Sequence, residues 1–317
     1  MEYRKLGRSG LKTSEIALGS WLTYGTATER DAAIACVHRA YELGINHFDC
    51  ANMYGATPHA AEDVLAEALK DFSRSSYILT TKAFGPVGPG PNDRGLSRKH
   101  IMEQVHESLR RLKTDYLDIM YCHRYDPETP VDETLRALDD LVTQGKVLYI
   151  GISEWTAAQV MEGVATTRQL GLDPITASQP VYNMLTRRIE AEELPVAARE
   201  GIGIVAFSPL AQGLLTGKYR PGQVPAGSRA ADPTVNRFIN RYLTDENLAK
   251  VDKLRPIAQD HGLSLAQLAL AWILRLPGVS SALIGATRTE QVDDNAGAAG
   301  VKLSEAVLGA IDDILNG

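Results

Sequence analysis

Eight short apolar runs recur along the chain, and stretches with the apolar spacing of a helix lie between most of them. A strand that alternates with a helix predicts parallel strands joined by right-handed crossovers. The runs are apolar on both faces, as expected when helices cover the sheet. The eight strand candidates are Ile16–Leu18, Asn46–Phe48, Tyr77–Thr81, Leu117–Tyr121, Val147–Ile152, Thr176–Gln179, Gly203–Phe207 and Ala282–Ile284.

A closed eight-stranded barrel and an open doubly wound sheet both fit this alternation. The strand number and the length of 317 residues favour the barrel, because a (β/α)8 TIM barrel commonly takes ~250 residues or more as one unit. We therefore predict one barrel domain over residues 1–317. An N-terminal β-hairpin, from Tyr3 to Ile16 around Arg8-Ser9-Gly10, is predicted to precede it.

Helical spacing is clearest where Ile101, Val105, Leu109 and Leu112 fall on one face, with Ser97 as the N-cap. Similar stretches are Val131–Thr143, Ala157–Leu170, Asp245–His261 and Ser264–Leu276. Residues Lys218 to Thr244 have neither pattern and are rich in Gly and Pro. A loop of this length inside a compact domain is usually functional or disordered.

Composition limits the classes of partner. The 33 Lys and Arg against 39 Asp and Glu give a net charge of −6, which argues against nucleic-acid binding. Cys36, Cys50 and Cys122 form no C-x-x-C pair and are expected to be reduced. No apolar run approaches the ~18 residues of a membrane span, and Met1–Lys5 does not resemble a signal peptide. We expect a cytoplasmic protein without a membrane or metal partner.

Ionisable side chains follow three consecutive strands. Asp49 comes after Phe48, Lys82 after Thr81, and His123 just beyond Tyr121 and Cys122, while Tyr54 lies on the first of these loops. Barrel enzymes carry their active groups at the C-terminal ends of strands. The spacing therefore predicts that an acid, an amine, an imidazole and a phenol meet at one rim.

These four groups suggest a proton-transfer scheme. Lys82 would lower the pKa of Tyr54 toward neutrality, Asp49 would hold Lys82, and His123 would orient a carbonyl oxygen that takes a proton from Tyr54. Each residue alone has an ordinary alternative. Asp49 would cap a helix, Tyr54 would be a half-buried aromatic, Lys82 would be solvated, and His123 would be structural.

A Rossmann-type dinucleotide site is not indicated. Gly201–Ala206 matches G-x-G-x-x-A but leads into a strand instead of leaving one. A barrel more often binds phosphate in the loops after its last two strands. Lys218 and Arg229 lie in one of these loops and are candidates to grip a ribose phosphate, the alternative being scattered surface charge.

Residues Phe48–Gly55, of sequence FDCANMYG, resemble the signature of the aldo-keto reductases, with Cys50 where Thr is usual. The resemblance runs nearly end to end and is nearest to the branch of potassium-channel β subunits and their bacterial relatives. It implies a catalytic tetrad of Asp49, Tyr54, Lys82 and His123, and NADPH as the cofactor. The cofactor contacts that it implies are Trp21, Ser153, Gln179, Ser208, Leu210, Gly213, Lys218, Ser228, Arg229, Gly285, Thr287, Gln291, Asp294 and Asn295.

Two positions depart from the channel-type pattern. His123 replaces the Asn of channel β subunits, which favours a working reductase, and Glu154 replaces an Arg, which puts one cofactor contact in doubt. The expected function is NADPH-dependent reduction of a small aldehyde or ketone. A slow, cofactor-binding regulatory subunit and a Schiff-base enzyme using Lys82 are the alternatives. The nearest relatives allow tetramers or larger assemblies, so a homo-oligomer stays open.

Overall fold

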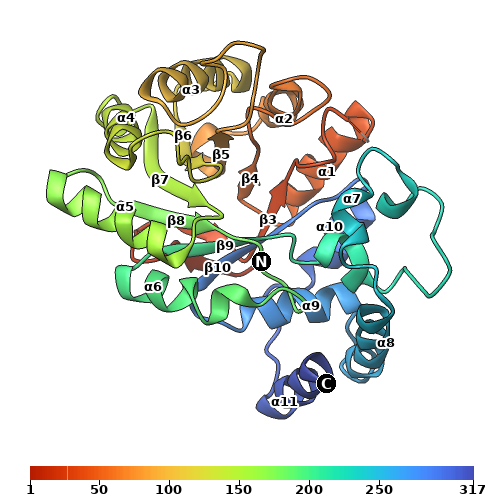
Figure 1. Cartoon of the computed structure of the whole chain (residues 1–317). Coiled ribbons are helices and arrows are strands. Elements are labelled where there is room, and N and C mark those ends of the chain that lie inside the picture. Colours follow the sequence, from red (N-terminus) through yellow and green to blue (C-terminus); the bar gives the residue numbers. More distant parts are fainter. Residues whose placement is uncertain (27) are drawn as a thin grey trace.

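The eight predicted strands form one closed parallel barrel in the computed structural model, which describes residues 1–26 and 28–317 (Figure 1). The last strand pairs with the first, with Ala282 opposite Ile16, and this closure excludes the open sheet. In barrel order the strands are β10 (Val279–Ile284), β3 (Ile16–Gly19), β4 (His47–Asp49), β5 (Ile78–Ala83), β6 (Leu117–Cys122), β7 (Val147–Ser153), β8 (Ile175–Gln179) and β9 (Gly203–Phe207).

The N-terminal hairpin, β1 (Tyr3–Lys5) and β2 (Lys12–Ser14), pairs antiparallel as predicted. Because β2 leads directly into β3, the hairpin lies at the end of the barrel where the strands begin. Leu6 is fully buried there and joins the inward-facing side chains of the strands. Gly7 has φ +56°, and a Cβ at this position would lie 2.2 Å from the Gly201 carbonyl oxygen, so only glycine fits.

Helices surround the barrel in Figure 1 and cover the outer face of its strands. The helix predicted from Ile101, Val105, Leu109 and Leu112 is confirmed: all four are buried, and the Ser97 hydroxyl accepts the His100 N–H. The α-helices are α1 (Arg30–Glu42), α2 (Ala60–Leu69), α3 (Arg98–Leu112), α4 (Val131–Thr143), α5 (Ala157–Leu170), α6 (Glu193–Glu200), α7 (Arg237–Asn240), α8 (Asp245–Asp260), α9 (Leu265–Leu274), α10 (Thr289–Ala296) and α11 (Glu305–Asn316).

The irregular segment from Lys218 to Thr244 contains only two short elements, the 3-10 turn η4 (Arg229–Ala231) and α7. Phe238 of α7 packs edge-on against Trp21, with ring centres 4.9 Å apart, and Phe207 also packs edge-on against Trp21, at 6.3 Å. The segment therefore reaches across to the loop after β3. Three short 3-10 elements complete the chain: η1 (Arg74–Ser76), η2 (Arg188–Glu190) and η3 (Ala211–Thr216).

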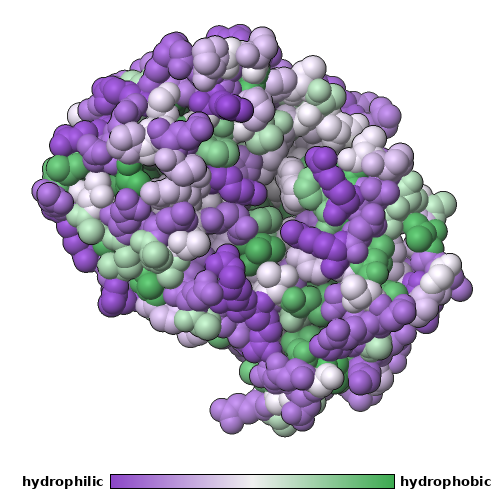
Figure 2. All heavy atoms as spheres, viewed as in Figure 1, coloured by the Kyte–Doolittle hydropathy of each residue, from purple (hydrophilic) through white to green (hydrophobic). Residues whose placement is uncertain are grey.

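The surface in Figure 2 is mainly hydrophilic, with apolar atoms in small patches between polar ones. In the described part of the chain, every helix is too short or too polar to cross a bilayer.

Candidate active site

The structure brings the four predicted residues together at the C-terminal end of the strands. Asp49 ends β4, His123 directly follows β6, and Tyr54 lies on the loop that leads to α2. Lys82 lies within β5, because that strand runs to Ala83 and pairs Lys82 with Tyr121. The expectation that Lys82 follows its strand was therefore wrong by two residues, although its side chain still points to the site. None of the four residues is more than 9% exposed.

Lys82 and Asp49 form a buried ion pair. The Lys82 ammonium also donates to the Cys50 carbonyl oxygen at 2.8 Å. The other Asp49 oxygen accepts from Thr80 Oγ1 at 2.7 Å and from Gln179 Nε2 at 3.0 Å. Neither ordinary alternative fits these contacts: Asp49 caps no helix, and Lys82 is 1% exposed. The pair brings a charged ammonium to the site without net charge.

Tyr54 and His123 contact each other, with 3.2 Å between the phenol oxygen and Nε2. Burial, with the nearby charges of Lys82 and Arg124, lowers the pKa of His123 well below its usual range. The imidazole is therefore neutral at pH 7. Its Nδ1 is buried and has no hydrogen-bond partner among residues 1–26 and 28–317.

The structure corrects one part of the proton-transfer scheme. Burial, with a smaller contribution from Asp49, raises the pKa of Tyr54 well above its usual value, where the sequence suggested that Lys82 would lower it. The ammonium lies 5.1 Å from the centre of the Tyr54 ring, but Asp49 neutralises it. Tyr54 is thus held as a neutral phenol that can donate a proton.

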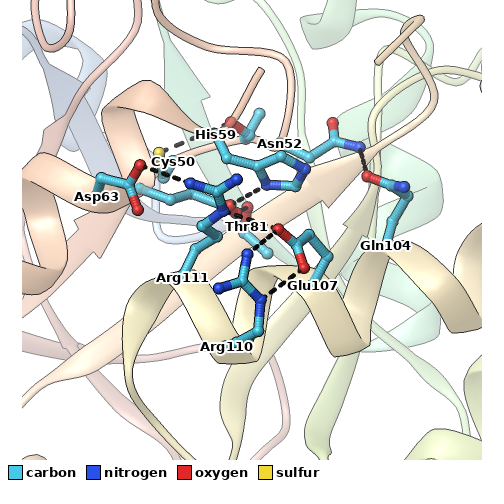
Figure 3. Close-up of polar contacts among 11 residues, drawn as sticks. Cys50, Asn52, His59, Asp63, Thr81, Gln104, Glu107, Arg110 and Arg111 are labelled. Carbon is cyan, nitrogen blue, oxygen red and sulfur yellow. Dashed lines mark hydrogen bonds and ion pairs between the residues drawn. The ribbon is translucent and has the colours of Figure 1, made fainter. Parts of the chain in front are cut away.

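A polar network surrounds Asn52 and His59, which flank Tyr54 in the sequence (Figure 3). Glu62 of α2 is fully buried, and its carboxylate accepts from Thr81 Oγ1 of β5 at 2.6 Å and contacts His59 Nδ1 at 2.6 Å. The His59 N–H donates to the Asn52 carbonyl oxygen at 2.6 Å, which spans the base of the loop. His59 has φ 67°, a left-handed conformation that costs free energy in a residue other than glycine. The Glu62 contact fixes that conformation and ties the loop to β5.

The outer layer of this network comes from α3. Asn52 Nδ2 donates to Gln104 Oε1 at 2.9 Å, and Arg111 bridges Glu107 of its own helix and Asp63 of α2 (Figure 3). The start and end of the Tyr54 loop are therefore held by β5, α2 and α3 together.

The residues expected at the nicotinamide end lie around the tetrad. Ser153 ends β7, and its hydroxyl donates to the carbonyl oxygen of Gln179, the last residue of β8, at 2.8 Å. Gln179 also donates to Asp49, so this part of the rim is continuous with the ion pair. Glu154 has φ 56° and accepts the Val181 N–H at 2.6 Å. Glu154 therefore holds the loop after β8 in place. The Arg that channel-type relatives carry at this position would instead supply a positive charge to the cofactor.

The turn after β9 is unusual in its backbone. Ser208, Ala211, Gln212 and Gly213 have φ values of 52°, 47°, 61° and 99°. Leu210 stands inside this turn, before η3. A cluster of non-glycine residues in the left-handed region is costly and is found mainly at functional sites. Gln212 bonds to the Ser208 hydroxyl on one side and to Arg229 on the other, so the turn is tied to the long segment.

A cationic cluster lies beside this turn. Partial burial lowers the pKa of Lys218, and the charges of Arg229 and Arg288 lower it further. Burial also lowers the pKa of Arg229. Within the described residues, the nearest carboxylate contact of the three is Arg288 to Glu290 at 3.9 Å. The buried Ser228 hydroxyl likewise has no partner in these parts of the chain. Unpaired cations with a free hydroxyl suit a phosphate group.

The residues expected at the adenosine end lie on the loop after β10 and along α10. The side-chain oxygen of Gln291 accepts the Thr287 N–H at 2.8 Å, and Gly285 and Thr287 are exposed on the loop after β10. Asn295 is buried, while the Asp294 carbonyl oxygen is held by Gln267 Nε2 at 2.9 Å. The structure thus places these residues at one end of the barrel rim, and their cofactor role stays a prediction.

Sequence reasoning did not single out Glu62, His59, Thr81 or Arg124. One signal for Glu62 was available: it stands in the alanine-rich start of α2, where one of two adjacent acids must face the barrel. Arg124 directly follows His123, and its guanidinium bonds to the His123 carbonyl oxygen at 2.5 Å.

Comparison with known proteins agrees with this geometry. The Aldo/keto reductase family matches residues 15–316. A "Probable voltage-gated potassium channel subunit beta" of Arabidopsis thaliana is 42% identical over 99% of this chain and 97% of its own length. The rice protein of the same description is 43% identical over 93% and 90%. An "L-glyceraldehyde 3-phosphate reductase" of Escherichia coli K12 is 40% identical over 93% and 86%. The chain belongs to the aldo/keto reductase family of oxidoreductases.

Proposed function

We propose that the protein reduces aldehydes or ketones to alcohols with NADPH, and that Tyr54 supplies the proton. The observation that carries this proposal is the buried arrangement of a neutral phenol, a neutral imidazole and an ammonium neutralised by Asp49. Such a set moves one proton and stabilises the anion that is left behind.

Each side chain of the site has a separate role in the proposed reaction. Tyr54 donates its proton to the carbonyl oxygen as that oxygen gains negative charge. An alkoxide is a much stronger base than a phenolate, so the transfer is favourable even though burial raises the pKa of Tyr54. Lys82 lies 5.1 Å from the centre of the phenol ring, and its ion pair with Asp49 keeps this part of the site without net charge. His123 offers one N–H to orient the carbonyl oxygen.

The cofactor residues fit NADPH. When bound, NADPH supplies the hydride. Ser153 and Gln179 would hold the nicotinamide amide beside Asp49, and Trp21 would line the same pocket. Ser208, Leu210 and Gly213 would follow the phosphates. Lys218, Ser228 and Arg229 would hold the 2′-phosphate, which is supported by their unpaired charges and the free Ser228 hydroxyl. The adenosine would lie against Gly285, Thr287, Gln291, Asp294 and Asn295.

A second candidate is a cofactor-binding regulatory subunit with slow turnover. It is supported by the similarity to the rice and Arabidopsis proteins that are described as probable potassium channel subunits. The two candidates share the cofactor site and differ in turnover.

The deciding experiment is a fluorescence titration of the purified protein with NADPH and, separately, NADH, followed by addition of 4-nitrobenzaldehyde. We expect tighter binding of NADPH and then loss of its absorbance at 340 nm as the aldehyde is reduced. Binding without oxidation across a panel of aldehydes favours the regulatory subunit. Absence of NADPH binding contradicts both candidates.

A further inference from the structure

Strand β5 contributes to the site from both of its faces. On the inner face, the side chains of Thr80 and Lys82 both donate to the Asp49 carboxylate. Thr81 stands between them and points outward, because successive side chains of a strand alternate between its two faces. Thr81 is fully buried, and its hydroxyl donates to Glu62 of α2 at 2.6 Å. Adjacent residues of one strand therefore hold the ammonium of the site and the helix that follows the Tyr54 loop.

The contacts continue from Glu62 around the loop and return to β5. Glu62 contacts His59 Nδ1 at 2.6 Å, and the His59 N–H donates to the Asn52 carbonyl oxygen at 2.6 Å. The Asn52 N–H in turn donates to the Lys82 carbonyl oxygen at 3.1 Å. The contacts thus leave the strand at Thr81 and return to it at Lys82, the next residue, which makes a closed ring.

The backbone of His59 shows that the ring depends on its imidazole. His59 has φ 67°, a conformation that glycine adopts without cost and histidine does not. Its side chain caps no N–H of α2 in the described part of the chain. The imidazole is instead buried against Glu62, with 5% of His59 exposed. Glycine would serve the turn alone, so the histidine adds the link to Glu62.

Tyr54 is bonded to this ring through its backbone. Its N–H donates to the Ala51 carbonyl oxygen at 3.0 Å, and its own carbonyl oxygen accepts the Ala61 N–H at 3.1 Å. The phenol oxygen lies 3.2 Å from His123 Nε2. A displacement of about 1 Å in a reacting group can cost about 10²-fold in rate. Small movements of the ring therefore matter for proton transfer.

We propose that Thr81, Glu62 and His59 are positioning residues, which hold the loop so that the Tyr54 hydroxyl meets the carbonyl oxygen of the substrate. This inference rests on the proposed reductase function and assigns to it three residues outside the tetrad. They act through Tyr54 and take no direct part in proton transfer.

Three variants test the ring, and a fourth is the control. Thr81→Val removes the hydroxyl and keeps the branched shape, while Thr81→Ser keeps the hydroxyl. His59→Gly keeps the left-handed backbone available and removes the imidazole. The control is Thr167→Val, because Thr167 is a buried threonine of α5 whose hydroxyl donates to the Val164 carbonyl oxygen at 3.0 Å. Urea unfolding establishes that each variant is folded.

Each change is made in the wild type and in Tyr54→Phe, and kcat is measured with NADPH and 4-nitrobenzaldehyde. In the wild type, Thr81→Val and His59→Gly should each lower kcat by about 10-fold or more, with an unchanged Kd for NADPH. In Tyr54→Phe they should change kcat by less than about twofold, because the hydroxyl that they position is absent. Thr81→Ser should recover most of kcat, and Thr167→Val should not alter it.

Two results of these measurements overturn the inference. One is an unchanged kcat when Thr81→Val and His59→Gly are made in the wild type. The other is an equal fall of kcat in both backgrounds, which would show that the residues support the whole site and do not act through Tyr54.

Amide hydrogen exchange of residues 52–61, measured without cofactor or substrate, separates this inference from the proposed function. Faster exchange in Thr81→Val and His59→Gly than in Thr167→Val supports the ring as the support of the loop. Unchanged exchange overturns the inference even if the wild type reduces aldehydes. Faster exchange in the variants of a protein that turns over no carbonyl compound contradicts the reductase function, and it overturns the catalytic role of the ring.

Discussion

Replacing Tyr54 with Phe removes one hydroxyl and keeps the ring. The ring lies beside the Lys82 ammonium at 5.1 Å and edge-on to His123 at 5.5 Å, and both contacts survive the change. Among the described residues, the hydrogen-bond contact of the hydroxyl is with His123 Nε2, at 3.2 Å. Its loss should cost only about 0.5–1.5 kcal/mol of unfolding free energy. The folded site therefore persists without its proton donor.

The effect on turnover should be far larger. A positioned general acid contributes about 10²–10⁴-fold, which is about 3–5 kcal/mol on the barrier. Because the hydroxyl acts in the transition state, kcat should fall by this factor while the Kd for NADPH stays nearly unchanged. Turnover is followed as loss of NADPH absorbance with 4-nitrobenzaldehyde, and Kd by fluorescence.

The matched control is Tyr24→Phe. Tyr24 is buried, and its hydroxyl has no partner in the described residues, so the same change there should leave kcat close to that of the wild type. A Tyr54→Phe variant that keeps kcat within about tenfold of the wild type would refute Tyr54 as the acid. A weakened Kd for NADPH with unchanged kcat would instead make Tyr54 a binding residue.

Three further predictions test other parts of the barrel. Arg229→Ala should weaken NADPH binding by about 10-fold or more with little effect on NADH, and equal weakening of both in a fluorescence titration would remove the 2′-phosphate assignment. Glu62→Gln should lower the free energy of unfolding in urea by about 1–3 kcal/mol and also lower kcat, because an amide has one acceptor oxygen for the two buried contacts to His59 and Thr81. The exposed acid Asp71, just after α2, changed to Asn serves as the control, and equal effects of the two changes would contradict the prediction. Burial lowers the pKa of His47 from 6.5 to about 4, so the unfolded chain binds a proton that the folded barrel excludes. This contribution to stability is present above pH 6.5 and is lost as the pH falls toward 4, by about 3 kcal/mol; His47→Gln should reduce the slope of stability against pH in this range, and an unchanged slope would show that another group is responsible.

Local patterns in the sequence were sufficient to predict most of the helices and strands. Apolar periodicity predicted α4 and α5 to their observed bounds. It succeeded because each element buries its own apolar face against the barrel. The meeting of Asp49, Lys82 and His123 followed from the same reasoning, since parallel strands present their C-terminal ends at one rim.

The other properties of the site depend on burial and backbone conformation, which the spacing of residues along the sequence does not predict. The pKa of Tyr54 is raised because burial keeps water from the phenol. The sequence showed only that Lys82 would be near, which suggested a lowered pKa. The Tyr54 loop is held by His59 in a left-handed conformation that a histidine rarely adopts. The bond of the Arg124 guanidinium to the His123 carbonyl oxygen depends on the conformation of the loop after β6, which residue spacing does not predict.

The pairing of β3 with β10 also affects how the chain is made. Ile16 emerges from the ribosome long before its partner Ala282. At about 5–20 residues per second, the first strand waits on the order of tens of seconds for its neighbour. During that time one edge of the growing sheet has no partner and is exposed to other nascent chains. We therefore expect the yield of folded protein to depend on chaperones during translation more than its final stability suggests.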